Sequence, residues 1–389
     1  MGQGNEKTDG PMLVNNPVAL KGTKLFKPIN VGELVLSHRL VMAPLTRLRA
    51  PNGIPHEEWM TEYYDQRSKR IGSLIITEGA IPKPQFGGLD NAPGLWSPEQ
   101  RRAWTKVIQR IHGNGSYVFV QLWSMGNQAD PLILAKNGLR YDSVTDEHYV
   151  SEELKEKAFK AENPQHGLTR KEIQEYVSGF VEASQRCIEM GADGVEIHAS
   201  NGYLLNQFLD PSCNTRKDEY GGSVENRSRF LLQVVDAVVQ RVGSSKVGIR
   251  ISPFTNFGSI AEIDKPETLA QYTHLLGQLE KRALSGHRLA YVHIVDPHER
   301  NLNHFVHTIW KGIVIRAGGL ATRPQVETEL VENDRTLLSY GRYFTSNPDL
   351  VDRIENGWPF TPYDPDTFTS GGSRGYVDYP PWELQKTLI

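Results

Sequence analysis

Three side chains that can donate hydrogen bonds lie within six residues, at His198, Asn201 and Tyr203. An imidazole and an amide can both donate to one carbonyl oxygen, and a phenol can deliver a proton. His198 ends the apolar run 194–198, where a buried strand should open into a loop, and the other two follow it. An isolated histidine–asparagine pair is more often a core histidine and a turn asparagine. The position at a strand end favours a functional role here.

Gln121 and Arg250 each interrupt an otherwise apolar run. An unpaired polar or charged group in a buried strand costs several kcal/mol. Two explanations stay open: the two side chains form a buried structural pair, or a bound polar ligand takes up their donors. We favour the ligand.

The elements that would carry these residues alternate along the chain. Eight short apolar runs, typical of parallel strands buried on both faces, cover 39–45, 74–78, 117–123, 194–198, 247–252, 290–295, 313–317 and 336–340. Helical patterns lie between them at 57–69, 97–112, 169–190, 223–242, 266–283 and from 323. This alternation predicts an α/β fold, a single (β/α)8 TIM barrel.

The barrel domain should cover 24–389, after an N-terminal arm at 1–23. The polar segment 124–168 after the third strand predicts an insertion that caps the site. A two-sheet Rossmann arrangement is the structural alternative. It is disfavoured because no G-x-G-x-x-G opens a helix after a strand.

Glycines follow the last two predicted strands, as Gly318-Gly319 and Gly341-Arg342. Barrels commonly hold phosphate at these two loops, where glycines let backbone amides approach an anion. Glycine pairs are also ordinary turn residues. The adjacent Arg342 favours a phosphate-bearing ligand.

Composition excludes several other classes. The 389 residues carry 43 Lys and Arg against 46 Asp and Glu, a net charge of −3 without a basic block, which argues against nucleic-acid and anionic-membrane partners. No apolar run reaches the ~18 residues that span a bilayer. With two cysteines and no signal peptide, the sequence predicts a soluble cytoplasmic protein. His293, His298, His304 and His307 cluster in a segment that looks loop-like, but their spacing fits no metal motif, so we expect no metal.

A long stretch at 191–230 resembles the signature of the Old Yellow Enzyme family of flavin-dependent ene-reductases. It reads GADGVEIHASNGYLLNQFLDPSCNTRKDEYGGSVENRSRF. Further matches run almost end to end, including MAPLTRLRA from Met42, LIITEGA from Leu74 and GIRISP from Gly248. NGLRYDS at 137–143 and NPQHGLT at 163–169 resemble the yeast and fungal branch.

The resemblance implies one non-covalent FMN at the top of the barrel, reduced by NADPH. By motif position, Thr46 would bind the flavin O4, Gln121 the pyrimidine edge and Arg250 the N1/O2 region. The remaining cofactor contacts would come from Pro44, Gly79, Gly318, Gly319, Gly341 and Arg342.

The resemblance also implies a ping-pong reaction in which NAD(P)H reduces the flavin and an enone or enal re-oxidises it. His198 and Asn201 would clamp the substrate carbonyl, or a phenolic ligand, and Tyr203 would protonate the α-carbon. Trp123 and Tyr376 would line the pocket. The family expectation is a monomer or homodimer acting on small molecules.

Three positions depart from the yeast pattern: Leu89 replaces a tyrosine, Gly319 replaces an asparagine, and the loop 296–307 is shorter. These affect substrate range and phosphate contacts.

Two alternative functions remain. An aldolase or isomerase without flavin is disfavoured because no lysine ends a strand. A redox-idle FMN- or steroid-binding protein is disfavoured by the intact His198, Asn201 and Tyr203.

Overall fold

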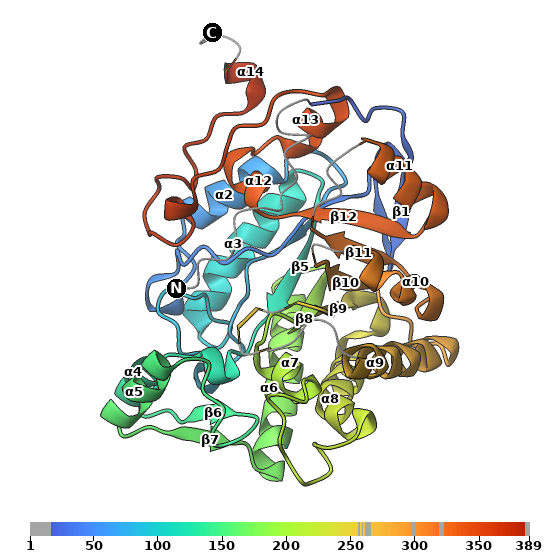
Figure 1. Ribbon diagram of the computed structural model, residues 1–389. Coiled ribbons are helices and arrows are strands. Elements are labelled where there is room, and N and C mark those ends of the chain that lie inside the picture. The colour runs from blue at the N-terminus through green and yellow to red at the C-terminus, as the bar shows by residue number, and fades with distance from the viewer. Residues whose placement is uncertain are drawn as a thin grey trace.

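The computed structural model describes residues 17–255, 257–258, 260, 266–297, 300–318 and 323–385. Its centre is a closed parallel barrel in the order β10-β11-β12-β3-β4-β5-β8-β9 (Figure 1). The strands are β3 (Leu40–Met42), β4 (Leu74–Ile76), β5 (Tyr117–Leu122), β8 (Gly194–Ala199), β9 (Val247–Ile251), β10 (Tyr291–Val295), β11 (Val314–Ala317) and β12 (Thr336–Tyr340). Each coincides with one predicted run, and the predicted (β/α)8 barrel is confirmed.

Helices surround the barrel on its outer side (Figure 1). They include α2 (Trp59–Arg67), α3 (Pro98–Gly113), α6 (Arg170–Glu189), α8 (Val224–Val242), α9 (Pro266–Leu284), α10 (Phe305–Ile309), α11 (Arg323–Glu332), α12 (Arg342–Ser346) and α13 (Leu350–Asn356). A capping box opens α3: Ser97 Oγ accepts from the Gln100 backbone N–H at 3.1 Å, and Gln100 Oε1 accepts from the Ser97 N–H at 3.0 Å.

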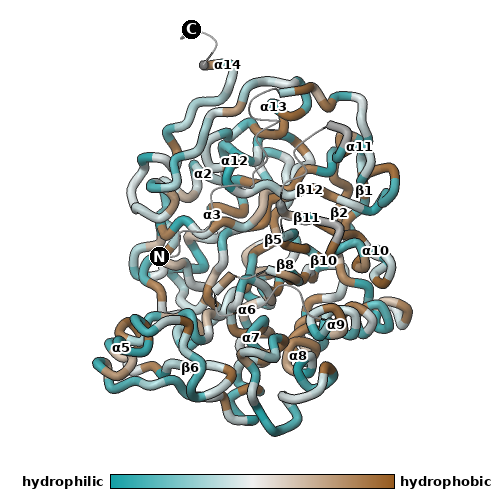
Figure 2. The backbone as a smooth tube through the Cα atoms, in the orientation of Figure 1, coloured by the Kyte–Doolittle hydropathy of each residue, from teal (hydrophilic) through white to brown (hydrophobic). Residues whose placement is uncertain are grey.

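The side chains that point into the barrel change from apolar to polar along its axis. Successive strand residues point to opposite faces, so every second residue points inward. Near the amino ends of the strands the inward residues form an apolar cluster that includes Phe119, Tyr291 and Leu337. Two positions further along β5 and β10, Gln121 and His293 replace apolar side chains. A second, larger apolar layer fills the space between strands and helices, and Figure 2 shows hydrophobic residues concentrated in the central strands.

The amino end of the lumen is closed by a hairpin of β1 (Ile29–Val31) and β2 (Leu34–Leu36). Val31 and Leu36 are fully buried and belong to the apolar cluster inside the barrel. Of the predicted arm at 1–23, residues 17–23 are described. The backbone N–H of Leu20 donates to Ile354 O at 3.1 Å, so this part of the arm packs along α13.

The segment after β5 forms a small subdomain at one edge of the molecule (lower left in Figure 1). It contains α4 (Pro131–Lys136), β6 (Tyr141–Ser143), α5 (Glu152–Lys160) and β7 (Gln165–Gly167), with β6 and β7 paired in parallel. Tyr176 of α6 donates to Asp142 Oδ2 at 3.0 Å and anchors this sheet. At its start, Gln128 Nε2 donates to Asn201 O at 2.8 Å. The role of 124–168 as a cap stays a prediction.

Candidate active site

The loop after β8 is held in one shape by its neighbours. Asn201 (φ 58°) and Gly202 (φ 71°) both adopt left-handed backbone, which asparagine and glycine tolerate best. Ser252, at the end of β9, accepts from the Asn201 N–H at 2.8 Å. Asn206 of α7 (Leu204–Leu209) accepts from the Gly202 N–H at 3.0 Å. The loop that carries Asn201 and Tyr203 is therefore fixed by hydrogen bonds at two successive residues, Asn201 and Gly202.

His198 ends β8 as a buried, neutral imidazole. Burial, followed by the charge of Arg250, lowers the pKa of His198 well below its ordinary value. Its Nδ1 lies 2.9 Å from Ser200 Oγ. When the serine hydroxyl donates to Nδ1, the ring proton lies on Nε2. Nε2 has no hydrogen-bond partner in the described part of the chain, so it is available to a ligand.

Tyr203 packs between two rings of the site. Its ring lies 4.9 Å from Trp123, edge to face, and 5.1 Å from His198. Burial raises the pKa of Tyr203 to about 12, against the opposing charge of Arg250, so the phenol keeps its proton at neutral pH. Gly79 makes room for the indole, because a Cβ there would lie 2.8 Å from the Trp123 ring. The structure thus brings His198, Tyr203 and Trp123 together.

Gln121 and Arg250 do not form the structural pair considered above. Gln121 Nε2 donates to Glu196 Oε1 at 2.7 Å. Arg250 is 8% exposed, and its buried Nε has no hydrogen-bond partner among the described residues. Burial lowers the pKa of Arg250, although Glu196 opposes that shift.

A buried guanidinium without acceptors is costly, so it indicates a ligand that supplies them. The N1/O2 edge of an isoalloxazine ring presents acceptors and takes up negative charge on reduction. Arg250 therefore fits the FMN that the sequence resemblance implies.

The predicted contacts at the other end of the cofactor lie on neighbouring strand ends. Ala317 of β11 pairs with Ser339 of β12, so Gly318 and Gly341 follow adjacent strands. Arg342 opens α12 with an exposed side chain. This arrangement suits a phosphate between the two loops. Gly319 lies outside the described residues.

Pro44 and Thr46 follow β3, with Pro44 buried and Thr46 half-buried. Their loop is tied to the end of β4, because Glu78 Oε2 accepts from the Arg47 N–H at 3.2 Å. Burial raises the pKa of Glu78 to about 7, against the opposing effect of Arg47. Glu78 therefore positions the loop that carries Thr46.

Tyr376 is fully buried rather than exposed on a pocket wall. It stacks on Tyr63 at 4.2 Å, and the guanidiniums of Arg49 and Arg47 lie 4.7 and 4.9 Å from its ring centroid. Its hydroxyl has no hydrogen-bond partner among the described residues. A ligand contact of this hydroxyl stays a prediction.

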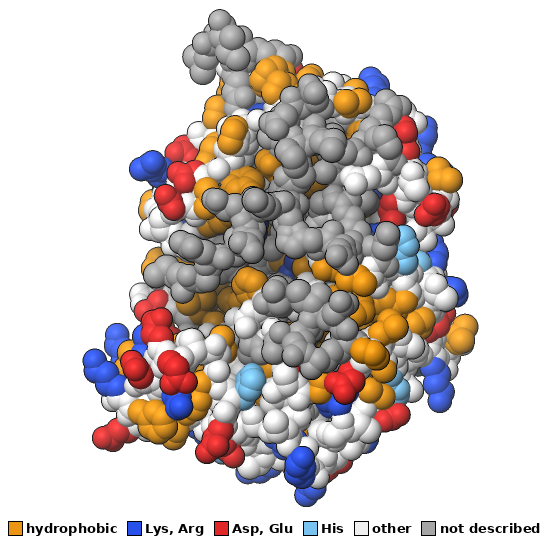
Figure 3. All heavy atoms as spheres, viewed as in Figure 1, with side chains coloured by type: hydrophobic (Ala, Val, Ile, Leu, Met, Phe, Trp, Pro, Cys, Tyr) orange, Lys and Arg blue, Asp and Glu red, His pale blue; other side chains and the backbone are white. Residues whose placement is uncertain are grey.

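The histidines considered for a metal lie in different elements. His293 belongs to β10, as the predicted run 290–295 implies and unlike the loop expected for the histidine cluster, and His307 belongs to α10. His298 is outside the described residues. Within the described ranges no group of three or more histidines, cysteines and carboxylates could hold a metal, and no helix is long and apolar enough to cross a membrane. Figure 3 shows side chains of both charge signs interspersed around the visible face.

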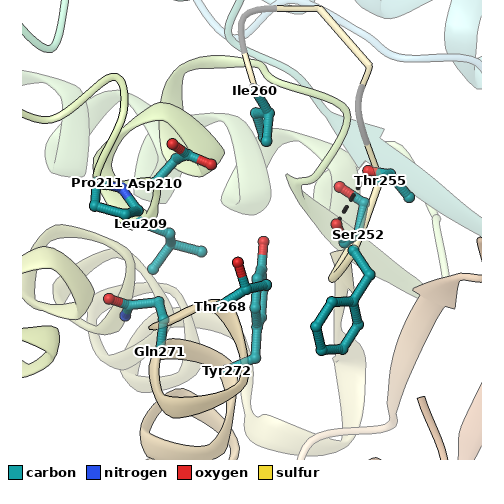
Figure 4. A pocket seen from close by; sticks show the side chains of 10 residues that line it. Leu209, Asp210, Pro211, Ser252, Thr255, Ile260, Thr268, Gln271 and Tyr272 are labelled. Atoms are coloured by element: carbon teal, nitrogen blue, oxygen red, sulfur yellow. Dashed lines mark hydrogen bonds between the residues drawn. The ribbon is translucent and has the colours of Figure 1, made fainter. Parts of the chain in front are cut away.

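A hollow lies beside the site loop, away from the predicted residues (Figure 4). It lies between α7, the end of β9 and α9, and is lined by Leu209, Asp210, Pro211, Ser252, Phe254, Thr255, Ile260, Thr268, Gln271 and Tyr272. Thr255 Oγ1 donates to Ser252 O at 3.1 Å, and Ser252 connects this wall to the site loop.

Two buried residues were not predicted as part of this site: Glu196, and His293, which the sequence analysis considered only as a metal ligand. His293 Nδ1 lies 2.8 Å from Glu196 Oε2, and both side chains are fully buried. The signal was present, because both interrupt apolar strands as Gln121 and Arg250 do. Glu196 also lies two positions before His198 and hence on the same face of β8.

The fold and these residues define a flavin-binding barrel oxidoreductase. A family model described as the NADH:flavin oxidoreductase / NADH oxidase family matches residues 24–360. The chain belongs to this family.

Individual relatives and a solved structure support the same family assignment. The chain is 50% identical over 382 residues to Enoate reductase 1 of Kluyveromyces lactis, covering 94% of this chain and 96% of that one. It is 38% identical over 384 residues to a probable NADPH dehydrogenase of Candida albicans, covering 94% and 93%. The crystal structure of Old Yellow Enzyme from Pichia sp. AKU4542 superposes with a TM-score of 0.89 at 40% identity, covering 92% and 94%. The protein is an FMN-dependent NAD(P)H oxidoreductase of the Old Yellow Enzyme type, as the resemblance implied.

Proposed function

We propose that the protein reduces the activated C=C bond of α,β-unsaturated carbonyl compounds in a ping-pong cycle, with NADPH as the reductant. When bound, FMN supplies the two-electron chemistry that connects the two half-reactions. The observation that carries the proposal is that His198, at the end of β8, lies next to Tyr203 of the fixed loop that also carries Asn201, and that the Nε of the neighbouring Arg250 has no partner among the described residues. The name of the relative from Kluyveromyces lactis supports the substrate class.

In this proposal the strand ends hold the cofactor. Arg250 faces the N1/O2 edge, Gln121 the pyrimidine edge and Thr46 the O4 atom. The backbone of Pro44 and Gly79 lies beside the ring, and Gly318, Gly319, Gly341 and Arg342 receive the phosphate. The buried Arg250 Nε without a partner supports the first of these assignments.

His198 and Asn201 clamp the carbonyl oxygen of the enone or enal. Neither the His198 Nε2 nor the Asn201 side chain has a hydrogen-bond partner among the described residues. Both can therefore donate to an oxygen that gains negative charge as the β-carbon is reduced. Such a donor is worth about 2.7–4 kcal/mol in the transition state. Phenolic ligands, whose oxygen resembles that of an enolate, would bind to the same clamp.

Tyr203 delivers the proton to the α-carbon. With a pKa of about 12, the phenol remains protonated throughout the neutral range. Trp123 holds it in place, edge to face at 4.9 Å. Tyr376, behind the site in its aromatic cluster, would contact the ligand only through its hydroxyl.

Tyr203→Phe tests the proposal by stopped-flow absorbance. Flavin bleaching by NADPH should keep its rate, because that step needs no external acid, while re-oxidation by cyclohexenone should slow by about 10²- to 10⁴-fold. Tyr117→Phe is the matched control, because Tyr117 lies at the start of β5, at the opposite end of the barrel. Equal enone rates in Tyr203→Phe and wild type would refute the proton-donor role. Equal slowing of both half-reactions would show that Tyr203 shapes the pocket and does not act as the acid.

A further inference from the structure

Glu196 is a fully buried carboxylate inside the barrel lumen, below the predicted cofactor contacts. Its strand neighbour in register is Gln121, which donates from Nε2 to Glu196 Oε1 at 2.7 Å. Its other oxygen, Oε2, lies 2.8 Å from His293 Nδ1. His293 in turn reaches Ser339 Oγ of β12 through Nε2 at 3.0 Å. The two oxygens of Glu196 therefore join side chains from three strands of the barrel.

This contact fixes which way the Gln121 amide points. An ionised carboxylate only accepts hydrogen bonds, so the NH₂ group of Gln121, and not its carbonyl oxygen, must face Glu196. The carbonyl oxygen Oε1 is then turned elsewhere, and it has no hydrogen-bond partner among the described residues. The pyrimidine edge of a flavin presents an N3–H donor, for which a fixed amide oxygen is the complementary group.

The charges support an ionised Glu196. Burial works against its charge, but His293, Arg250 and Gln121 together hold the pKa of this carboxyl below its usual value. Burial lowers the pKa of His293 in spite of the adjacent carboxylate. Burial also keeps the nearby Tyr291 phenol protonated by raising its pKa. The lumen thus holds one anion, Glu196, below the cation Arg250.

We propose that Glu196 is a positioning residue that sets the reduction potential of the bound cofactor. It orients Gln121 toward the pyrimidine edge, and its negative charge partly offsets the guanidinium of Arg250. The inference rests on the proposed FMN site. A flavin that gains negative charge on reduction is stabilised by Arg250 and destabilised by Glu196.

Glu196→Gln separates charge from shape, because a glutamine can still accept from Gln121 and donate to His293. The enzyme should retain FMN, while the ratio of its affinities for reduced and oxidised FMN rises at least tenfold. For a two-electron couple this ratio corresponds to a shift of about 30 mV to more positive potential. The potential is measured by slow reduction of the holoenzyme beside a reference dye, and FMN affinity by titration of the apoprotein.

Glu329→Gln is the matched control, since Glu329 of α11 is also a buried carboxylate, but its partner is Arg316, outside the site. Its loss should lower the melting temperature and leave the flavin potential unchanged. An unchanged affinity ratio in Glu196→Gln, or an equal change in both variants, overturns the proposal. A wild-type protein that binds no FMN overturns the proposed function instead.

Glu196→Asp is a second variant for the case in which Glu196→Gln does not fold. It keeps the charge but withdraws the carboxylate from Gln121. Oxidised FMN should then bind at least tenfold more weakly, with a potential close to that of wild type. Unchanged FMN affinity in this variant would show that Glu196 does not position Gln121.

Discussion

Two buried arginines, on strands separated by β10, have opposite surroundings. Arg316 of β11 is 3% exposed and donates to Asp296 at 2.8 and 3.0 Å and to Glu329 at 2.6 Å. Burial works against its charge, but the two carboxylates raise the pKa of Arg316 above its ordinary value. Arg250 of β9 is 8% exposed, has a lowered pKa, and leaves its Nε without a partner among the described residues.

The different surroundings of the two arginines indicate two roles: Arg316 stabilises the fold, whereas Arg250 is available to bind a ligand. The partners of Arg316 come from β10–α10 and α11, so its network fastens the helical layer to the barrel. Arg250 points into the lumen between His198 and His293, its register neighbours on β8 and β10. Burial alone does not distinguish the two roles, whereas the presence or absence of protein acceptors does.

The largest expected effect comes from replacing each arginine by methionine in the apoprotein. Arg316→Met leaves Asp296 and Glu329 without their cation, and breaking such a buried network costs about 3–5 kcal/mol of unfolding free energy. Arg250→Met removes a charge whose Nε has no hydrogen-bond acceptor among the described residues, although Glu196 also loses its nearby cation. The apoprotein should therefore lose much less stability than Arg316→Met, while FMN is lost. Urea unfolding followed by tryptophan fluorescence measures the first effect and flavin absorbance the second. Equal destabilisation by both substitutions would contradict the distinction.

Acid should weaken the Arg316 network. Burial works against the charge of Glu329, but His307 and Arg316 hold its pKa at about 2. A depressed carboxyl pKa stabilises the fold above the unfolded pKa near 4.5 and loses that contribution as the pH falls toward 2. The contribution is about 3 kcal/mol. The difference in unfolding free energy between wild type and Glu329→Gln should therefore shrink between pH 5 and pH 3. A constant difference would rule out this linkage.

A third arginine extends the comparison, because Arg342 is exposed at the start of α12. Arg342→Ala should weaken FMN binding about ten- to hundredfold, the value of a hydrogen bond to a charged group, with the apoprotein fold retained. FMN titration of apoprotein, with Arg374→Ala as a control, measures this change. Unaltered affinity would place the phosphate elsewhere.

The smallest expected effect is at Ser200, whose hydroxyl lies 2.9 Å from His198 Nδ1. Ser200→Ala removes a single hydrogen bond, worth about 0.5–1.5 kcal/mol. Phenol binding should weaken by a few-fold because the Nε2 tautomer of His198 is no longer favoured. Ser212→Ala is a suitable control, since Ser212 lies beyond α7. Phenol affinity is measured by titration, through the long-wavelength charge-transfer band. Equal phenol affinity in Ser200→Ala and wild type would contradict this role of Ser200.

The sequence predicted the barrel well, because its eight strands are buried on both faces and show as continuous apolar runs. It also placed His198, Asn201 and Tyr203 correctly at the end of β8. Tyr376 was less predictable, since its stacking on Tyr63 joins residues more than three hundred positions apart.

The pairing of Glu196 with His293 was not predicted, for a related reason. Each residue interrupts an apolar strand, but the strand alone does not show which side chain it meets. Their pairing becomes visible only when the register sets Gln121 against Glu196 and brings β10 across the lumen. Gln121 likewise bonds to Glu196 and not to Arg250 because β5 lies next to β8, which the local sequence pattern does not show.

The pairing of β12 with β3, through Leu338 and Leu40, has a consequence for biosynthesis. These strands are about 300 residues apart, which at ~5–20 residues per second takes about 15–60 s to translate. Until β12 emerges from the ribosome, one edge of β3 lacks its partner. Arg47 and Arg67 likewise cannot form their hydrogen bonds to the carbonyls of Gly375 and Phe344 until those residues have been synthesised. The nascent chain must therefore remain protected from aggregation until nearly all of it has been made.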